Sequence, residues 1–296
     1  MLAPPLLDAL IDRTLEEDLA GGDLTTEACV DPGARAVGKA VARRPLVVCG
    51  GPVFRRLFER LDPTAVFEGE VQEGLLVPTG AVLWSVRASA RALLSGERSA
   101  LNLVQRMSGV ATTSRLYVEA LPKGSATRIT DTRKTTPGLR ALERYAVRVG
   151  GAHNHRDSLG SAVMIKDNHI VAAGGITAAI ERARARAPHT SRIEVEVASL
   201  AELEQALSAR ADIIMLDNFT LPDVHEAVRR VRSLSTPGAT PPDPRSRLSW
   251  HPIVEVSGGI TLERIPELAN AGVDVISCGA LTHSAPAADI ALDLKL

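Results

Sequence analysis

Six short apolar runs, each followed by a polar or glycine-rich cluster and then by a helical stretch, dominate the second half of this chain of 296 residues. The runs are ATRIT, SAVMIK, RIEVEV, ADIIML, PIVEVS and VDVISC, and the helical stretches begin near residues 138, 174, 199, 222, 262 and 286. Such alternation is typical of parallel strands joined by crossover helices. Because no GxGxxG sequence follows the first run, a (β/α) barrel is favoured over a doubly wound sheet.

The first hundred or so residues show a different pattern. Residues 5–20 are amphipathic up to a glycine pair, which predicts a short helix. Val-rich runs broken by Gly and Pro between about 36 and 90 predict a small, largely antiparallel sheet. Residues 91–121 lack Pro and are rich in Leu, Ala, Arg and Glu, which predicts one long helix or two. Later in the chain, the Pro-rich segment 235–250 interrupts the strand–helix alternation and is predicted to be a surface loop.

Charge and cysteine content limit the classes of function. The formal net charge of −1 argues against a global basic field for nucleic acid, so any anion site must be built locally. The widely spaced Cys29, Cys49 and Cys278 fit neither a disulfide framework nor a zinc knuckle, which indicates a reducing cytoplasm. The first twenty residues carry acids and no early basic cluster, so we expect no secretion signal. No apolar run approaches the length of a membrane span.

Charged residues or glycines stand at the end of nearly every predicted strand, where barrel enzymes place their active residues. In chain order these ends are Asp131-Thr132-Arg133-Lys134, Lys166, Glu196, Asp217, Ser257-Gly258-Gly259 and Gly279. The alternation within RIEVEV directs both Glu194 and Glu196 into the barrel, because the helices cover its outer face. Buried charges are costly unless paired, so these groups imply mutual pairing, a ligand, or both. The alternative for Glu194 and Glu255 is an ionic network that only supports the barrel.

Two further features point to an anionic ligand. Residues 128–166 hold eight Arg or Lys against three acids, a local excess that an anion site requires. A solvated helix face is the better interpretation for Arg144 and Arg148 within this block. The segments SGGI (257–260) and SCGAL (277–281) follow the last two strands, where glycines let backbone N–H groups approach a phosphate. Together these features predict a phosphosugar ligand.

Motifs along nearly the whole chain resemble those of the quinolinate phosphoribosyltransferases. In the family's order they are EEDLAGGDLTTE (16–27), GERSALNLVQRMSGVAT (96–112), DTRKTTPGLRALERYAVRVGGAHNHR (131–156), IKDNHI (165–170), EVEV (194–197), LDNF (216–219), EVSGGI (255–260) and GALTHS (279–284). The resemblance implies an N-terminal α/β sandwich over about 1–112, with a mostly antiparallel sheet and joined by a C-terminal helix at about 285–296. An incomplete (β/α) TIM-like barrel is expected over 113–284.

The resemblance also implies the activity and the assembly. Such enzymes are glycosyltransferases of the pentosyltransferase class that act in NAD biosynthesis. They join quinolinate to the ribose of phosphoribosyl pyrophosphate and release pyrophosphate and carbon dioxide, with Mg²⁺ as the metal. The expected working unit is a homodimer, or a higher assembly built from it, in which the sandwich of one chain covers the barrel mouth of the other. We expect neither a nucleic acid nor a membrane as a partner.

Site residues follow from the resemblance position by position. The quinolinate pocket is expected to contain Arg133, Lys134, His155, Arg156 and Lys166, with Arg98 reaching in from the neighbouring subunit. The phosphoribosyl pyrophosphate side is expected to contain Glu196, Asp217, Ser257, Gly258, Gly259, Gly279 and His283. Glu196 and Asp217 are also expected to face Mg²⁺, indirectly. The expected catalytic set is Lys134, Lys166, Glu196 and Asp217.

Two departures from the family pattern and three alternatives accompany this interpretation. The loop 235–250 is longer than the resemblance leads us to expect, and His153 is an additional cation that we place at the surface. The alternatives are an accessory protein of molybdenum transport with the same fold, a nicotinate phosphoribosyltransferase, and a non-catalytic phosphosugar-binding barrel. The complete DTRKT block with its NHR turn favours quinolinate. The inward Glu196 and Asp217 argue against the non-catalytic barrel.

Overall fold

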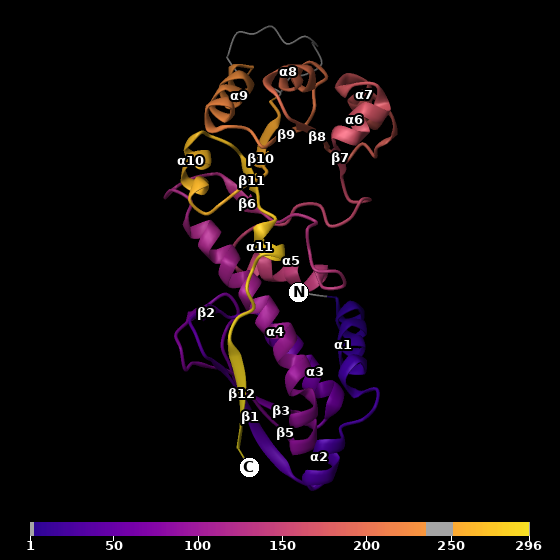
Figure 1. The fold of residues 1–296 in the computed structure, drawn as a ribbon, viewed down its shortest axis with the longest axis vertical. Coiled ribbons are helices and arrows are strands. Elements are labelled where there is room, and N and C mark those ends of the chain that lie inside the picture. The colour runs from indigo at the N-terminus through magenta and orange to yellow at the C-terminus, as the bar shows by residue number, and fades with distance from the viewer. Residues whose placement is uncertain (1–2, 235–250, 296) are drawn as a thin grey trace. The chain divides into compact units, whose positions relative to one another are not determined.

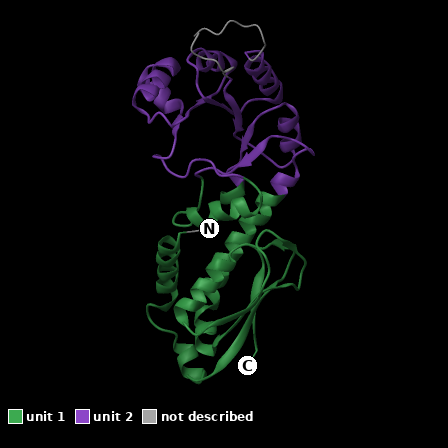
Figure 2. Ribbon diagram, turned by 180° about the vertical axis from the view of Figure 1, so that it is seen from behind, with its two compact units in different colours: residues 1–115, 134–152, 281–296 green, residues 116–133, 153–280 purple. Residues whose placement is uncertain are grey.

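The computed structural model describes residues 3–234 and 251–295, so the predicted loop 235–250 lies outside the described residues (Figure 1). The chain forms two compact units (Figure 2). The first unit contains residues 1–115, 134–152 and 281–296, and the second contains residues 116–133 and 153–280. Among the described residues, none of the helices combines the length and the apolar character that crossing a membrane requires.

The first unit is built on an antiparallel sheet, as the Val-rich runs predict. Its strands run in the order β12-β1-β5-β3, and a separate pair joins β2 to β4. The strands are β1 (Arg35–Ala42), β2 (Leu46–Val47), β3 (Val66–Glu70), β4 (Leu76–Val77), β5 (Val82–Ser89) and β12 (Ile290–Lys295). The helices wholly or mainly in this unit are α1 (Pro4–Leu19), α2 (Leu24–Cys29), α3 (Gly51–Leu61), α4 (Ala90–Glu119), α5 (Arg140–Val149) and α11 (Ala280–His283).

The end of the chain is a strand, so the prediction of a C-terminal helix at about 285–296 is wrong. Strand β12 pairs antiparallel with β1, with Leu292 opposite Ala40. Ile290 and Leu292 are buried while Asp293 is exposed, which is the two-residue period of a strand. A helix this short gains little on its own, whereas the edge of β1 offers a row of backbone partners.

A buried ion pair ties the last part of the chain to α4 and α5 within the first unit. Glu143 has a fully buried side chain, and Arg106 donates to it over 2.8 Å. The same guanidinium also donates to the carbonyl of Ala285 over 2.6 Å. The approach is close, because a Cβ at Gly109 would lie 1.9 Å from the carbonyl oxygen of Pro286. Glycine is therefore required at this point of α4.

The second unit is the predicted incomplete barrel. Six parallel strands run in the order β6-β11-β10-β9-β8-β7, and within the described residues β6 and β7 do not pair with each other. The strands are β6 (Arg128–Thr130), β7 (Val163–Ile165), β8 (Ile193–Val197), β9 (Ile213–Asp217), β10 (Ile253–Ser257) and β11 (Val275–Ser277). Its helices are α6 (Asp167–Ala173), α7 (Ile176–Arg186), α8 (Leu200–Ser208), α9 (Leu221–Ser233) and α10 (Arg264–Asn270).

Local sequence explains where these elements begin. Ser199 and Thr220 cap α8 and α9, and each side-chain oxygen accepts a backbone N–H from the first turn. Strand β8 is buried at almost every position, as expected for a strand with helices on one face and the barrel interior on the other. Because all six strands are parallel, their carboxyl ends lie at the same end of the unit.

The burial of the cysteines gives a test of this fold. Cys29 is exposed, whereas Cys49 and Cys278 are buried in the first and second units, and all three are unpaired. Burial raises the pKa of Cys278 to about 12 and that of Cys49 well above its ordinary value. We expect iodoacetamide at about pH 8 to alkylate Cys29 alone, because the thiolate is the nucleophile. Intact-mass measurement checks this, with the guanidinium-unfolded chain as the control. Two adducts on the folded protein would contradict the fold.

Candidate active site

The tips of β9 and β10 meet in register and bring two predicted residues together. Asp217 stands opposite Ser257 in the parallel pairing. The carbonyl of Ser257 accepts the N–H of Asn218 over 3.1 Å, and Asn218 donates its side-chain amide to Asp217 over 2.9 Å. Gly258 follows with φ of +88°, and a Cβ there would lie 2.3 Å from the amide oxygen of Asn218. The glycine is therefore needed for both its backbone conformation and its close contact.

A lysine and a glutamate form an ion pair at the neighbouring strand ends. Lys166 follows β7 directly, and its ammonium group contacts the carboxylate of Glu196 near the end of β8. The Lys166 side chain is 45% exposed and that of Glu196 is 17% exposed. The pair is therefore open enough to exchange partners with a ligand, and a pair this exposed contributes little to stability by itself.

Deeper in the same unit, one histidine lies between two buried acids. The Nε2 atom of His155 is 3.4 Å from a carboxylate oxygen of Glu194 on β8 and 3.3 Å from one of Glu255 on β10. Both acid side chains are 3% exposed, against 13% for His155. Ser277 at the end of β11 donates its hydroxyl to Glu255. The other oxygen of Glu194, Oε1, is buried and has no hydrogen-bond partner among the described residues.

This His155–Glu194–Glu255 cluster retains a proton at neutral pH. Burial by itself lowers the pKa of His155, but hydrogen bonds to Glu194 and Glu255 outweigh it and raise that pKa to about 10. Burial also raises the pKa of Glu255, against the effect of His155 and with the help of the Glu194 charge. Two buried acids and a neutral ring would carry two negative charges. The retained proton reduces this to one and is a property of the whole cluster.

The turn that carries His155 is fastened to the end of β6. His153 donates its N–H to the carbonyl of Ile129 over 2.8 Å, so this turn continues alongside the strand. Asp131 is fully buried and accepts the side chain of Asn154 over 2.6 Å and the N–H of His155 over 2.7 Å. The side chain of His153 is exposed, as predicted. Asp131 therefore fixes the backbone of the turn at His155, and Arg156 is the residue that follows His155.

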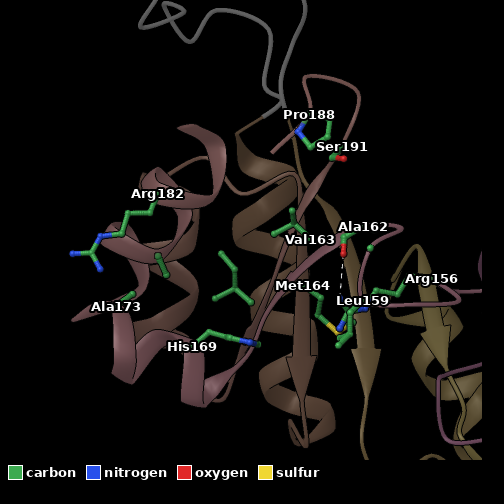
Figure 3. A pocket seen from close by; sticks show the side chains of 13 residues that line it. Arg156, Leu159, Ala162, Val163, Met164, His169, Ala173, Arg182, Pro188 and Ser191 are labelled. Atoms are coloured by element: carbon green, nitrogen blue, oxygen red, sulfur yellow. Dashed lines mark hydrogen bonds between the residues drawn. The ribbon is translucent and has the colours of Figure 1, made fainter. Parts of the chain in front are cut away.

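Arg156 extends from this turn toward β7. Its Nη1 donates to the carbonyl of Ala162 over 3.1 Å (Figure 3). Burial, and secondarily the positive charge of Arg133, lowers the pKa of Arg156. The two arginines therefore act on each other electrostatically, as two cations of an anion site do. Arg156 also borders a pocket lined by β7, His169 and Arg182, but Glu196 and Asp217 are not among its lining residues (Figure 3).

The predicted site residues divide between the two units. The second unit contains Arg133, His155, Arg156, Lys166, Glu196, Asp217, Ser257, Gly258, Gly259 and Gly279. The first unit contains Arg98, Lys134 and His283. Arg98 and His283 are both exposed, and the carbonyl of Lys134 accepts the hydroxyl of Thr282 over 2.8 Å. The residues that the structure brings together are therefore those at the strand ends of the second unit.

Comparison with known proteins agrees with this geometry. Residues 23–108 match the family model "Quinolinate phosphoribosyl transferase, N-terminal domain", and residues 110–293 match the model of the C-terminal domain. The chain belongs to the quinolinate phosphoribosyl transferase family. The nicotinate-nucleotide pyrophosphorylase [carboxylating] of Mycobacterium leprae is 42% identical over 290 residues, covering 96% of this chain and 95% of that protein. The Homo sapiens protein of the same name is 40% identical over 296 residues, covering 99% and 93%.

A solved member of the family has the same fold. The crystal structure of NadC from Streptococcus pyogenes superimposes with a TM-score of 0.90 at 37% identity, covering 100% of this chain and 98% of that one. The family assignment from the motifs is thus confirmed, and so is the fold class of an antiparallel α/β part followed by an incomplete parallel barrel.

The structure also brings in residues that the sequence patterns do not single out. Asp131 was noted only as a strand end, and neither Asn154 nor Ser277 was selected. Asp131 and Ser277 stand at the ends of apolar runs, which is the available signal, whereas Asn154 lies between two histidines and offers no such signal. Glu194 and Glu255 were predicted to point into the barrel, but their shared partner His155 lies far away in the sequence. Only the folded chain brings the three together.

Asp131 provides a test of how the turn is held. We expect Asp131→Ala to lower the free energy of unfolding by about 3 kcal/mol, because it removes a buried carboxylate and leaves the donors of Asn154 and His155 without their acceptor. Urea unfolding followed by circular dichroism measures this. Asp289→Ala, which removes an exposed carboxylate, is the matched control and should change stability by no more than about 0.5 kcal/mol. Equal effects for the two variants would show that Asp131 does not hold the turn.

Proposed function

We propose that this protein transfers the phosphoribosyl group of phosphoribosyl pyrophosphate to quinolinate and forms nicotinate mononucleotide, pyrophosphate and carbon dioxide. The observation that carries the proposal is the match to both family domains along nearly the whole chain, with relatives named for this carboxylating activity at about 40% identity. The strand ends of the second unit supply the cations and acids that two anionic substrates need. The reaction makes the protein a pentosyltransferase of NAD biosynthesis.

Quinolinate carries two carboxylates, which require several cations within reach. The proposed pocket comprises Arg133, Lys134, His155, Arg156 and Lys166, with Arg98 from a second chain. Arginine binds carboxylates through two parallel hydrogen bonds, and lysine supplies a compact point charge. The positive charge of Arg133 contributes, after burial, to the lowered pKa of Arg156, which supports their common role. The exposed Lys166–Glu196 pair can open toward the substrate at little cost.

The ribose and its phosphates are proposed to lie over the late strands. The loop residues Ser257, Gly258, Gly259 and Gly279 hold the 5′-phosphate, and His283 lies close to it. Gly258 and Gly259 both have positive φ, which turns the backbone at this loop in a way that other residues rarely adopt. Backbone N–H groups in such a loop can point toward an anion.

Glu196 and Asp217 are proposed to face the ribose hydroxyls and the region of the metal. Carboxylate oxygens are the ligands that Mg²⁺ prefers, and both residues are partly exposed at neighbouring strand ends. Mg²⁺ usually keeps several waters and is held by one or two carboxylates together with substrate phosphates, so these two acids fit it. When bound there, Mg²⁺ would neutralise charge on the departing pyrophosphate.

The chemistry then needs no covalent intermediate with the protein. Pyrophosphate leaves with the electron pair of its bond to ribose C1, and Glu196 and Asp217 stabilise the positive charge that develops on the sugar. The lone pair of the pyridine nitrogen forms the new bond to C1. The bond between the adjacent ring carbon and its carboxylate then breaks, carbon dioxide departs, and the electron pair of that bond stays on the ring carbon, where the pyridinium charge stabilises it until a proton from solvent is taken up. The cation that faces this carbanion is one of two lysines, Lys134 or Lys166.

We further propose a homodimer with shared active sites, located in the cytoplasm. The exposed position of Arg98 on α4 supports the first point, since it leaves the guanidinium available to a second chain. Three unpaired cysteines are consistent with a reducing compartment.

Removal of one cation tests the site. We expect Lys166→Ala to lower kcat by about 10² while leaving the fold intact, because a charge placed for the transition state is worth about that factor. Lys123→Ala, which removes an exposed lysine of the same unit, should retain the normal rate. Carbon dioxide release from carboxyl-labelled quinolinate measures both, with nicotinate and no base as substrate controls. A near-normal rate for Lys166→Ala would remove Lys166 from the site.

Subunit mixing tests the shared site. Arg98→Ala and Lys166→Ala should each have very low activity, but each retains the group that the other lacks. If one chain completes the site of the other, equal mixing after subunit exchange should restore about one quarter of the normal activity, since half the dimers are mixed and each has one complete site. Native mass spectrometry confirms the exchange. No recovery in exchanged dimers would contradict the role of Arg98 across the interface.

A further inference from the structure

Two buried carboxylates lie within a site whose proposed substrates are strongly anionic. Glu194 and Glu255 are each 3% exposed, and they belong to two strands that are not adjacent in the sheet. A carboxylate in this place repels an anionic substrate, and its burial costs several kcal/mol without a partner. Any contribution of these acids to the reaction is then exerted through the group that they share, which is His155.

Glu255 is held in place from two sides. One of its oxygens accepts the hydroxyl of Ser277, and the same oxygen lies 3.3 Å from Nε2 of His155. Ser277 is itself 2% exposed, so this serine–glutamate–histidine chain is inside the barrel. Glu194 and Glu255, which lie on strands distant in the sequence, both approach Nε2 of His155, and the ring cannot turn without breaking these contacts.

The second ring nitrogen of His155, Nδ1, connects the ring to Arg156. Nδ1 of His155 accepts the N–H of Arg156 over 2.7 Å. Asp131 holds the same turn through the N–H of His155. Because Nδ1 accepts a hydrogen bond, the ring carries its own proton on Nε2, and the additional proton that the cluster retains is on the side of the acids and not on Nδ1. The orientation of the ring therefore determines the direction in which the backbone at Arg156 leaves the turn.

We propose that Glu255, fixed by Ser277, is a positioning residue for quinolinate: through the ring of His155 it sets the orientation of Arg156. This inference rests on the proposed function, because it assigns Arg156 to the pocket of that substrate. Glu255 itself does not touch the substrate. Glu194 supplies the second acceptor on the same ring nitrogen.

The substitution Glu255→Gln should have opposite effects on quinolinate binding, depending on whether Glu255 acts through its charge or by positioning His155. Glu255→Gln removes a buried negative charge and keeps the shape of the side chain. If the charge acted only on the substrate, quinolinate would bind more tightly to the variant. If Glu255 acts by holding His155, quinolinate binds more weakly, because the amide can donate to Nε2 and reverse the hydrogen bonding of the ring.

Steady-state kinetics of the full-length enzyme separates these outcomes. For Glu255→Gln we expect the KM for quinolinate to rise about tenfold, equivalent to about 1.4 kcal/mol. The KM for phosphoribosyl pyrophosphate should stay within about twofold and kcat should fall by less than about threefold, since a positioning effect confined to one substrate changes its binding. The matched control is Glu226→Gln, which removes an acid paired with Arg229 and Arg230 on α9.

The outcomes that would overturn the proposal are distinct from a failure of the proposed function. A wild-type enzyme that releases no carbon dioxide from quinolinate contradicts the function. A folded Glu255→Gln variant with unchanged or lower KM for quinolinate, or equal increases for both substrates, contradicts the inference alone. If Glu255→Gln does not fold, Ser277→Ala replaces it; this variant keeps both acids and should raise the KM for quinolinate about threefold, and no rise overturns the proposal.

A metal in the same place would also overturn the positioning role. Within the part of the chain that the structure describes, His155, Glu194 and Glu255 form the one group of three side chains whose ligand atoms are close enough to share an ion. A stoichiometric transition metal in the purified protein, lost in Glu255→Gln, would mean that the acids hold a cation. Elemental analysis of wild type and variant without such a metal supports the hydrogen-bonded arrangement.

Discussion

The structure of the second unit depends on how acids inside a ring of parallel strands are neutralised. Strand β8 places Glu194 and Glu196 on the same face, and β10 adds Glu255. Each acid has its own means of compensation: Lys166 pairs with Glu196 near the surface, while His155 and a retained proton serve the two deeper acids. A ring of apolar residues would be simpler to stabilise. The acids therefore impose a specific arrangement on loops that are otherwise free to vary.

The pairing of these acids explains why one short turn, at residues 153–156, affects the stability of the unit and, in the proposed function, the binding of the substrate. The turn at residues 153–156 is bonded to β6 through its backbone, to Asp131 through two donors, and to the deep acids through the ring of His155. Arg156 leaves the turn with few remaining degrees of freedom. In the role proposed for Arg156, a guanidinium held in this way before the substrate arrives would reduce the entropy lost on binding. The same reasoning applies to the glycine loop after β10, where close contact with Asn218 fixes the backbone.

Much of this could be predicted from the sequence, because the signals are local. The runs that became β6 to β11 are short, apolar and followed by polar clusters, and the inward direction of Glu194 and Glu196 follows from the two-residue period of a strand. The prediction of a helix at residues 285–296 is wrong because the conformation of this segment is not decided by local signals. A six-residue segment such as β12 takes its conformation from the free edge of β1, and that edge is formed by residues some 250 positions earlier.

The strand–helix alternation, the charges at the strand ends and, through the motifs, the family can all be recognised in the amino-acid sequence. Which of those charges meet depends on the folded chain: His155 lies between Glu194 and Glu255, Ser277 fixes Glu255, and Asp131 anchors the turn. The physical reason is that periodicity specifies the face of an element on which a side chain stands. The partner across the barrel depends on strand order and register, which arise only when distant segments pack together.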